Sequence, residues 1–272
     1  MNPRDQAGSA ASDYREFRAP ARLAEYVLCF WTQSIGSQAE FAQRVLPDGC
    51  VDFILLNGAP TVIGPWTRPY VARLAPGTKI VGARCHPGTA SSLLGMPASE
   101  LLNQSVALDD VWGRDFAARF ERIADQSGVA AELSALEGAL IGRLRRARPI
   151  DYATRAAIQW IARNPHGRVE TLSDLLGLSP RQIQRRFKIA VGYGPKLFQS
   201  VLRFQRLLNL AADSSEQRSL AEFAADADYS DQAHMTREVQ RFTGGTPGTL
   251  LKSSRCALRL SSLIHDANGR AH

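Results

Sequence analysis

Hydrophobic residues in the C-terminal third of the chain recur every three or four positions, the period of a helix with one buried side. The clearest case runs from Thr171 to Lys188, with the sequence TLSDLLGLSPRQIQRRFK. We predict a first short helix here, with Leu172, Leu175 and Leu176 on its apolar side. Gly177 follows where a helix commonly ends, because glycine adopts positive φ without a Cβ penalty. The pattern therefore predicts two short helices around a tight turn.

The second of these helices carries a complete start signal. Ser179 is placed as the N-cap, Pro180 as the first helical residue and Gln182 as the capping-box partner. Ile183 and Phe187 are spaced to pack inward. The outward residues are Arg181, Gln184, Arg185 and Lys188. Such long donors on a capped helix suit base edges in a DNA major groove, whereas the alternative is a solvated helix of an ordinary helical hairpin.

This two-helix unit occurs twice. A long helix is predicted from Pro195 to Leu210, about 24 Å at 1.5 Å per residue. Beyond it, Leu220, Phe223, Tyr229, Ser230, Met235, Val239, Gly244 and Pro247 repeat the positions of Leu172, Leu175, Leu178, Ser179, Ile183, Phe187, Gly192 and Pro195. The offset grows along the repeat, so the second turn is expected to be slightly longer. Tandem units favour DNA reading, because the long helix could hold two reading helices about one DNA turn, roughly 34 Å, apart.

The N-terminal half shows a different pattern, with short β-branched and aromatic runs between Gly, Pro and Asn. We predict strands over residues 25–34, 51–56, 60–63 and 78–85, with a turn at 47–49 and a stop at 57–58. Strands at this spacing indicate an antiparallel sheet or a small, cupin-like barrel. The predicted fold class is α+β: an antiparallel β domain with flanking helices, then an all-α tandem helix-turn-helix domain.

Helical patterns return between Pro97 and Arg148. We expect short helices over residues 98–103 and 113–126, then a longer one over 130–147. Its stripe of Leu133, Leu136, Leu140 and Leu144 could form a dimer seam but is favoured to pack within its own domain. The basic segment from Arg143 to Pro149 reads as a hinge. The predicted organisation is a flexible tail over 1–20, an effector-sensing or dimerisation domain over 21–148, a DNA-binding domain over 149–253 and a tail over 254–272.

The net charge of the chain indicates what kind of partner it binds. The 272 residues carry a formal net charge of +7, which favours an anionic partner. From 163 to 206 there are nine Lys and Arg against two Asp and Glu, but from 207 to 255 five against seven. We therefore expect the first unit to supply most of the affinity for phosphates and the second to add sequence preference. No apolar run is long enough to span a membrane, and the opening residues lack a signal core, so a cytoplasmic protein is expected.

Candidate chemistry in the N-terminal half is sparse. Cys29, Cys50, Cys85 and His86 could form a thiol or metal sensor, but neighbouring strand residues face opposite sides and cysteines are commonly buried. The aromatic residues there could line a ligand pocket or simply form a core. No Ser-His-Asp set, paired metal-ligand motif or phosphate loop is present. We therefore predict no enzyme, no cofactor and no metal.

The stretches LSDLLGLSPRQIQRRFKIAVGYGPK and AADADYSDQAHMTREVQRFTGGTP resemble the DNA-binding domain of AraC/XylS-type transcriptional regulators, from about Tyr152 to Leu251. The resemblance implies seven helices docking on two successive major grooves of double-stranded DNA. It implies base reading by Arg181, Gln184, Arg185, Gln232, His234 and Arg237. We assign backbone contacts to Arg186, Lys188, Lys196, Ser179 and Ser230. One departure is Asp228, where the family usually has Gly; because Asp tolerates left-handed φ, the turn is expected to survive.

The N-terminal half more loosely resembles the effector domains of a poorly characterised subgroup with a cupin-like fold, through RVLPDGCVDFIL, VGARCHPGTASSLLG and LDDVWG. The resemblance implies a small-molecule effector or a homodimer contact, together with contact to RNA polymerase, most often as an activator. Two alternative functions are also considered. Reactive-cysteine alkyl acceptors carry Pro-Cys-His-Arg, whereas this chain has Arg-Cys-His-Pro at 84–87. A DNA-binding protein without sequence preference would need only Lys and Arg, not the Gln and His expected to read bases.

Overall fold

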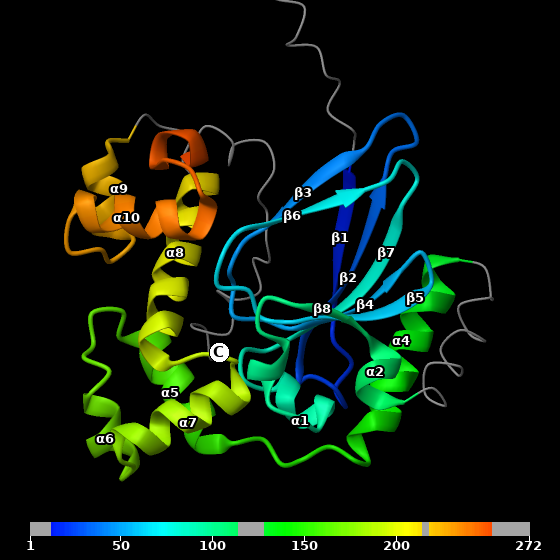
Figure 1. Ribbon diagram of the computed structural model, residues 1–272, viewed down its shortest axis with the longest axis horizontal. Coiled ribbons are helices and arrows are strands. Elements are labelled where there is room, and N and C mark those ends of the chain that lie inside the picture. The colour runs from blue at the N-terminus through cyan, green and yellow to red at the C-terminus, as the bar shows by residue number, and fades with distance from the viewer. Residues whose placement is uncertain (1–11, 114–127, 214–217, 252–272) are drawn as a thin grey trace, which may run out of the picture.

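The computed structural model describes residues 12–113, 128–213 and 218–251, which form two domains joined by a single connection (Figure 1). The N-terminal domain is built from β-strands with helices packed beside them, and the C-terminal domain is built from helices. This arrangement confirms the α+β class and the order of the domains. No helix within the described ranges is long and apolar enough to cross a membrane.

Two antiparallel sheets make up the N-terminal domain. The larger has the strand order β1-β2-β7-β4-β5-β8, and the smaller pairs β3 with β6. The strands are β1 (Ser12–Arg18), β2 (Val27–Ile35), β3 (Phe41–Val45), β4 (Asp52–Leu56), β5 (Ala59–Ile63), β6 (Tyr70–Leu74), β7 (Lys79–Cys85) and β8 (Ser105–Ala107). Residues alternate between two apolar clusters. Phe30, Phe53 and Val81 belong to one cluster, whereas Trp31, Ile54 and Ile80 belong to the other, as the two-residue period of a strand requires.

The four predicted strands correspond to β2, β4, β5 and β7. The stop after β4 is a tight hairpin, in which Asn57 and Gly58 have φ of 49° and 83° and Leu56 pairs with Ala59. The prediction of a flexible tail over 1–20 is wrong for residues 12–18, because β1 pairs with β2 over its whole length. Its burial pattern is mostly exposed, which explains why hydrophobicity did not reveal it. Residues 1–11 lie outside the described part of the chain.

Helices cover one side of the larger sheet (Figure 1). They are α1 (Ala90–Leu94), the 3-10 helix η1 (Ala98–Leu101), α2 (Leu108–Trp112) and α4 (Val129–Leu144). On α4, Leu136 and Leu140 are fully buried in the same cluster as Phe53, and Leu133 and Leu144 pack against it. The leucine stripe therefore packs within its own domain, as favoured from the sequence. The helix predicted over 113–126 lies outside the described residues.

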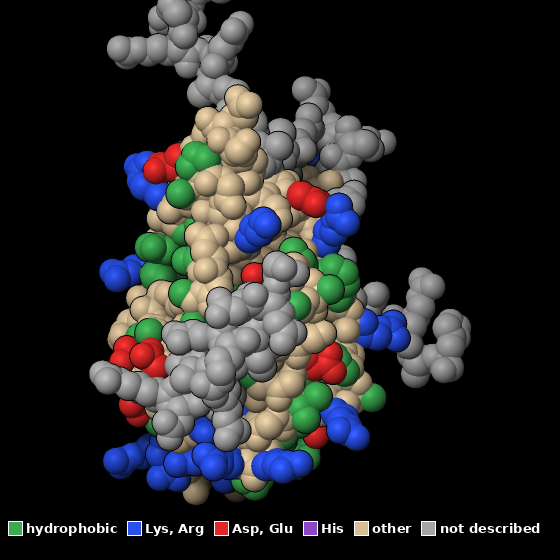
Figure 2. Space-filling model, turned by 90° about the vertical axis from the view of Figure 1, so that its right-hand side faces the viewer, with side chains coloured by type: hydrophobic (Ala, Val, Ile, Leu, Met, Phe, Trp, Pro, Cys, Tyr) green, Lys and Arg blue, Asp and Glu red, His purple; other side chains and the backbone are tan. Residues whose placement is uncertain are grey.

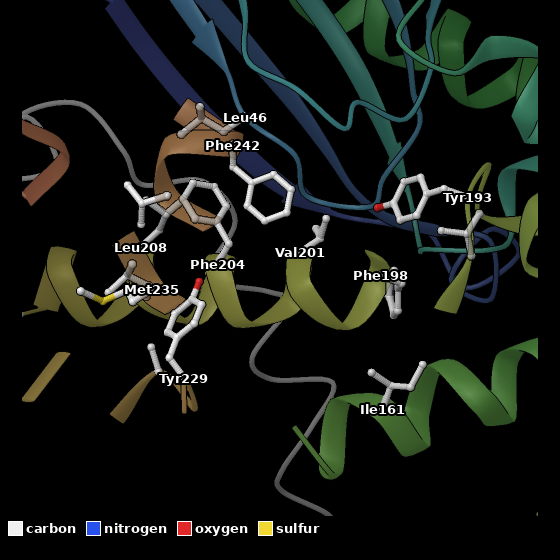
Figure 3. Packing of buried hydrophobic residues seen from close by; sticks show 14 of the residues in the cluster. Leu46, Ile161, Tyr193, Phe198, Val201, Phe204, Leu208, Tyr229, Met235 and Phe242 are labelled. Atoms are coloured by element: carbon white, nitrogen blue, oxygen red, sulfur yellow. The ribbon is translucent and has the colours of Figure 1, made fainter. Parts of the chain in front are cut away.

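The C-terminal domain is organised around one long helix. Its helices are α5 (Tyr152–Arg163), α6 (Thr171–Leu176), α7 (Pro180–Ala190), α8 (Pro195–Asp213), α9 (Leu220–Asp226) and α10 (Gln232–Thr243). Residues 247–251 are also helical, so the described part of this domain agrees with the seven helices implied by the resemblance. Figure 3 shows Phe198, Val201, Phe204 and Leu208 along α8, where they contribute to the core of both two-helix units. The tail predicted from residue 254 lies outside the described residues.

One segment of the β domain, residues 44–49, reaches across to the helical domain. The Gln205 side chain on α8 donates a buried hydrogen bond of 2.6 Å to the Pro47 carbonyl oxygen. Arg44 donates one of 2.7 Å to the carbonyl of Thr243, at the end of α10. Leu46 belongs to the apolar core of the helical domain and lies near Phe242 (Figure 3). The two domains thus share part of one core.

Two glycines mark further close contacts between the domains, one against the start of α8 and one just after α7. A Cβ on Gly49, whose φ is 83°, would lie 2.9 Å from the Phe198 ring. On the other side of this contact, a Cβ on Gly192 would lie 2.6 Å from the Pro65 ring. Glycine is needed at both positions because the two domains approach so closely. The β domain therefore touches both two-helix units and the helix between them.

Candidate nucleic-acid interface

The first two-helix unit follows the local signals read from the sequence. The helix α6 ends at Gly177, which has φ of 61° and donates its N–H to Ser173. At the start of α7 the Ser179 hydroxyl accepts from Gln182 N–H, and the Gln182 side chain accepts from Ser179 N–H at 2.8 Å. Pro180 takes the first helical position. These contacts satisfy the free N–H groups of the first turn and fix the direction in which α7 points.

The helix α7 divides cleanly into a buried side and an exposed side. Ile183 and Phe187 are 3% and 0% exposed and pack into the domain core, as predicted. Arg181, Gln184, Arg185 and Lys188, which were predicted to face outward, are exposed, as are Gln182 and Ile189. The prediction for α6 was less accurate, because Leu175 is 56% exposed and only Leu172 is fully buried. The exposed side of α7 offers donors that can reach base edges and phosphates.

Gln184 lies against the turn that follows α7. A Cβ built on Gly194 would come within 2.4 Å of the Gln184 amide nitrogen and 2.6 Å of its amide oxygen. The side chain is therefore supported by a neighbouring backbone rather than extending freely from the helix. Such support reduces the side-chain entropy that Gln184 would lose on contacting DNA.

Arg186 occupies a different place from the one expected. Its Nη1 binds Asp151 Oδ1 at 2.8 Å, and the same carboxylate accepts from the backbone N–H groups of Ala153 and Thr154 at the start of α5. The Asp151 pKa is lowered: burial alone would raise it, but hydrogen bonds from Arg186 and Thr154 outweigh that effect. Arg186 therefore joins α7 to α5. Because its guanidinium already binds a carboxylate, it is less available for a DNA phosphate.

The other residues assigned to backbone contacts differ in how free they are. Lys196, at the start of α8, forms an exposed ion pair of 2.8 Å with Glu170. The Ser179 hydroxyl is used in the capping box. Lys188 is exposed and has no ion pair within the described chain. Of the set in the first unit, Lys188 is the side chain most available for a phosphate.

The second unit repeats this architecture with a longer turn. Ser219 and Glu222 form a capping box at the start of α9. Asp228 has φ of 64°, so the left-handed conformation expected at the position of the family glycine is present. The N-cap of α10 is Asp231, whose carboxylate accepts from His234 N–H at 2.6 Å. Ser230, which the repeat aligned with the cap Ser179, lies one residue before it because the turn contains the extra residues.

Asp228 also holds the second unit in place. Its carboxylate forms an ion pair with Arg206 on α8 and lies 2.9 Å from His166 Nε2. The side chain is only 13% exposed. Its carboxylate is therefore largely taken up by partners within the domain. Asp228 thus connects the turn of the second unit with α8 and with the loop before α6.

The base-reading candidates of the second unit fall into two groups. Gln232 and Arg237 are exposed on α10. His234 is half-buried: its Nδ1 lies 3.1 Å from the Ser230 hydroxyl, and its Nε2 lies 3.6 Å from Glu238. Its ring also meets Tyr229 edge-on. The Nδ1 atom of His234 thus has a hydrogen-bond partner inside the unit, its Nε2 faces Glu238, and the Ser230 hydroxyl is occupied as well.

The cysteines offer no reactive site in the described chain. Cys29, Cys50 and Cys85 are free and buried. Burial raises the pKa of Cys29 to about 12 and raises those of Cys50 and Cys85 well above their ordinary value. These thiols therefore stay protonated and are poor nucleophiles or metal ligands. His86 is held by contact with the Ala24 carbonyl, and burial lowers its pKa.

No group of three His, Cys, Asp or Glu side chains in the described ranges could hold a metal ion. The polar centre of the β domain is instead an ion cluster. Arg84 binds both carboxylate oxygens of Asp52 at 3.0 Å and approaches Asp48 at 3.8 Å. Burial raises the pKa of Asp48 and outweighs the opposing effect of Arg84. Asp48 belongs to the same turn as Pro47 and Gly49, so this cluster supports the segment that contacts the helical domain.

Family models match both halves of the chain. One described as a helix-turn-helix domain matches residues 172–253, and one described as a domain of unknown function, DUF6597, matches residues 15–107. The first match covers the two capped units and the helix between them. The C-terminal domain is an AraC-type helix-turn-helix domain. The chain is accordingly a DNA-binding transcription regulator with a separate N-terminal domain.

Among curated proteins, the search found no significant sequence match. Solved structures with detectable similarity include ToxT from Vibrio cholerae O395, with a TM-score of 0.42 and 8% identity over 92% of this chain and 99% of that chain. Another is an unsaturated fatty acid bound wild-type ToxT from Vibrio cholerae strain SCE256, with a TM-score of 0.38 and 9% identity over 90% and 95%. These scores are too low to transfer any residue role to this chain.

Proposed function

We propose that the AraC-type domain binds a specific DNA sequence by placing α7 and α10 in two successive major grooves. The main support for this proposal is the set of exposed hydrogen-bond donors on α7. They project from a capped helix whose opposite side is anchored by Ile183 and Phe187. Arg181, Gln184 and Arg185 would read bases from the first unit, and Gln232 and Arg237 from the second. The helix α8 has 19 residues, about 28 Å at 1.5 Å per residue, which suits units one DNA turn apart.

Two of the earlier assignments take a supporting role in this proposal. His234 is proposed to hold Ser230 and the turn of the second unit, since its Nδ1 is hydrogen-bonded to Ser230 and its Nε2 faces Glu238. Arg186 is proposed to fix α7 against α5 through Asp151. Lys188 and Lys196 are proposed as backbone contacts, with Lys196 exchanging Glu170 for a phosphate.

We further propose that the N-terminal domain controls DNA binding through residues 44–49. This segment contacts α8 through Pro47 and the end of α10 through Arg44. Because Asp48 in the same turn joins the buried cluster of Arg84 and Asp52, a change inside the β domain would be transmitted to α8 and to the second reading unit. A small-molecule effector or a second copy of the chain would act through this route. The family resemblance favours activation together with RNA polymerase, in the cytoplasm.

Selection of bound duplexes from a random DNA pool tests the proposed function. The full chain should enrich two short motifs whose centres are about one helical turn, 10–10.5 base pairs, apart. Changing that spacing by about half a turn should abolish the joint contribution of the two motifs. Recovery of no common motif, with binding of all duplexes alike, would show that the protein binds DNA without reading its sequence. A transcription assay on the selected site would then give the sign of regulation.

A further inference from the structure

The connection between α4 and α5 contains three arginines that have no role in the DNA contacts proposed above. Arg145, Arg146 and Arg148 are all exposed. Their side chains form no ion pair or hydrogen bond with the described part of the chain. Near α7, Arg186 and Lys196 are partly neutralised by Asp151 and Glu170. Arg181, Arg185 and Lys188 on α7 itself have, like the three arginines, no ion pair within the described residues. The connection is therefore a concentration of uncompensated positive charge.

The backbone of this connection is held in place, in contrast to the hinge that the sequence suggested. Arg143 donates to the carbonyls of Leu93 and Leu94 at 2.7 and 3.0 Å, and so ties the end of α4 to the end of α1. Its guanidinium also lies over the Trp112 ring. Further along, Arg148 N–H donates to the Ser92 carbonyl at 3.1 Å. The three exposed arginines therefore project from an ordered backbone, which lowers the entropy lost when they bind a partner.

The position of the connection points to the partner. Arg148 lies three residues before Asp151, at most about 10 Å along an extended chain, and Asp151 binds Arg186 on α7. In Figure 1 the connection, α6 and α7 form the lower edge of the molecule. Figure 2 shows Lys and Arg side chains gathered along that edge. The arginines thus continue the basic surface of the first reading unit.

We propose that Arg145, Arg146 and Arg148 bind DNA phosphates that flank the site read by α7. The inference rests on the proposed DNA-binding function and extends the interface beyond the AraC-type domain into the connection between domains. Guanidinium groups suit phosphate oxygens, which they contact through two parallel hydrogen bonds. Contacts of this kind add affinity for any duplex and leave base preference unchanged. The connection would also place the β domain at a fixed distance from the DNA backbone.

The salt dependence of binding tests this proposal. Each phosphate contact contributes about 0.9 to the slope of log K against log salt. The triple variant R145Q/R146Q/R148Q of the full chain should lower that slope by about 1 to 3 between roughly 50 and 200 mM salt. Its ratio of affinities for selected and scrambled duplexes should equal that of the wild type. The matched control is R15Q/R73Q/K79Q, which removes three exposed charges from β1, β6 and β7 and should leave the slope unchanged.

The outcomes separate this inference from the proposed function. If the wild type binds with a salt-dependent slope and R145Q/R146Q/R148Q keeps that slope, the arginines do not contact DNA. Their effect would then be limited to the stability of α4, because the positive charge of Arg145 at its C-terminal end interacts favourably with the helix dipole. Equal slope losses in the two triple variants would point to net charge alone and also overturn the proposal. If the wild type binds no duplex, the proposed function fails and this inference fails with it.

Discussion

Asp151 and Arg186 join the first helix of the AraC-type domain to the helix proposed to read DNA. The carboxylate caps α5 through Ala153 and Thr154 and binds Arg186 Nη1 at 2.8 Å. Both partners are partly exposed, at 27% and 39% of their side chains, so the pair is a positioning contact more than a large source of stability. Its geometry sets the orientation of α7 relative to the remainder of the domain.

Acidification should weaken this contact. The Asp151 pKa is lowered in the folded protein, so its contribution is complete above the ordinary Asp pKa of about 3.9 and disappears as pH falls through the lower folded value. The variant D151N should be less stable than the wild type at pH 7, and the difference should shrink as the pH approaches about 3. Urea unfolding at both pH values measures this. A difference that is independent of pH would assign the loss to the cap geometry alone.

The core anchor of α7 should dominate the stability of the first unit. Phe187 is fully buried and lies 6.0 Å, between ring centroids, from Phe198. Phe187→Ala should therefore lower the free energy of unfolding by about 3–5 kcal/mol. Ile189→Ala on the same helix is the control, because Ile189 is 43% exposed and its loss should cost little. Similar losses in the two variants would contradict the packing described for α7.

Gly194 should affect DNA reading without contacting DNA. Because a Cβ at this position would overlap the Gln184 amide, Gly194→Ala should displace that side chain. We expect the variant to lose preference at the base pair that Gln184 reads, to the same extent as Gln184→Ala. The double variant should lose no more than either single variant, because both changes remove one contact. Additive losses at that base pair would show that Gln184 does not depend on the turn.

The shared core predicts how the helical domain behaves alone. A fragment over residues 149–253 has its own apolar cluster and should fold and bind the selected site. It should melt at a lower temperature than the same domain in the full chain, because Leu46 and the Pro47 carbonyl no longer cover α8. Gln205→Ala in the full chain should reproduce part of that decrease. An unchanged melting temperature in both would mean that the domain contact contributes nothing.

Features that depend on residues close together in the chain could be predicted from the sequence. The capping box at Ser179, the glycine end of α6 and the left-handed Asp228 each depend on residues a few positions apart, and each could be predicted. Strands β2, β4, β5 and β7 are apolar runs and were visible for the same reason. Strands β1, β3 and β6 carry exposed or half-buried residues for most of their length, so hydrophobicity gave no signal for them.

Features that join distant parts of the chain were not predictable in this way. Nothing near Arg186 in the sequence indicates that Asp151, 35 residues away, would bind it. The contact of Gln205 with Pro47 spans 158 residues and depends on how the two domains dock. The same holds for His234, whose sequence position suits base reading but whose ring is directed toward Ser230 and Glu238. Whether a polar residue that the sequence pattern places on the surface is available to bind DNA therefore depends on tertiary packing.

The central claim is that α7 reads DNA sequence, and competition between a selected and a scrambled duplex measures it directly. Arg185→Ala should lower the affinity for the selected duplex by about 1–3 kcal/mol, while affinity for the scrambled duplex falls much less. The ratio of the two affinities should therefore decrease by roughly 5- to 150-fold. Arg15→Ala, on the exposed strand β1, should leave the ratio unchanged. If Arg185→Ala keeps the wild-type ratio, α7 does not read bases through this residue and the assignment of the first unit is wrong.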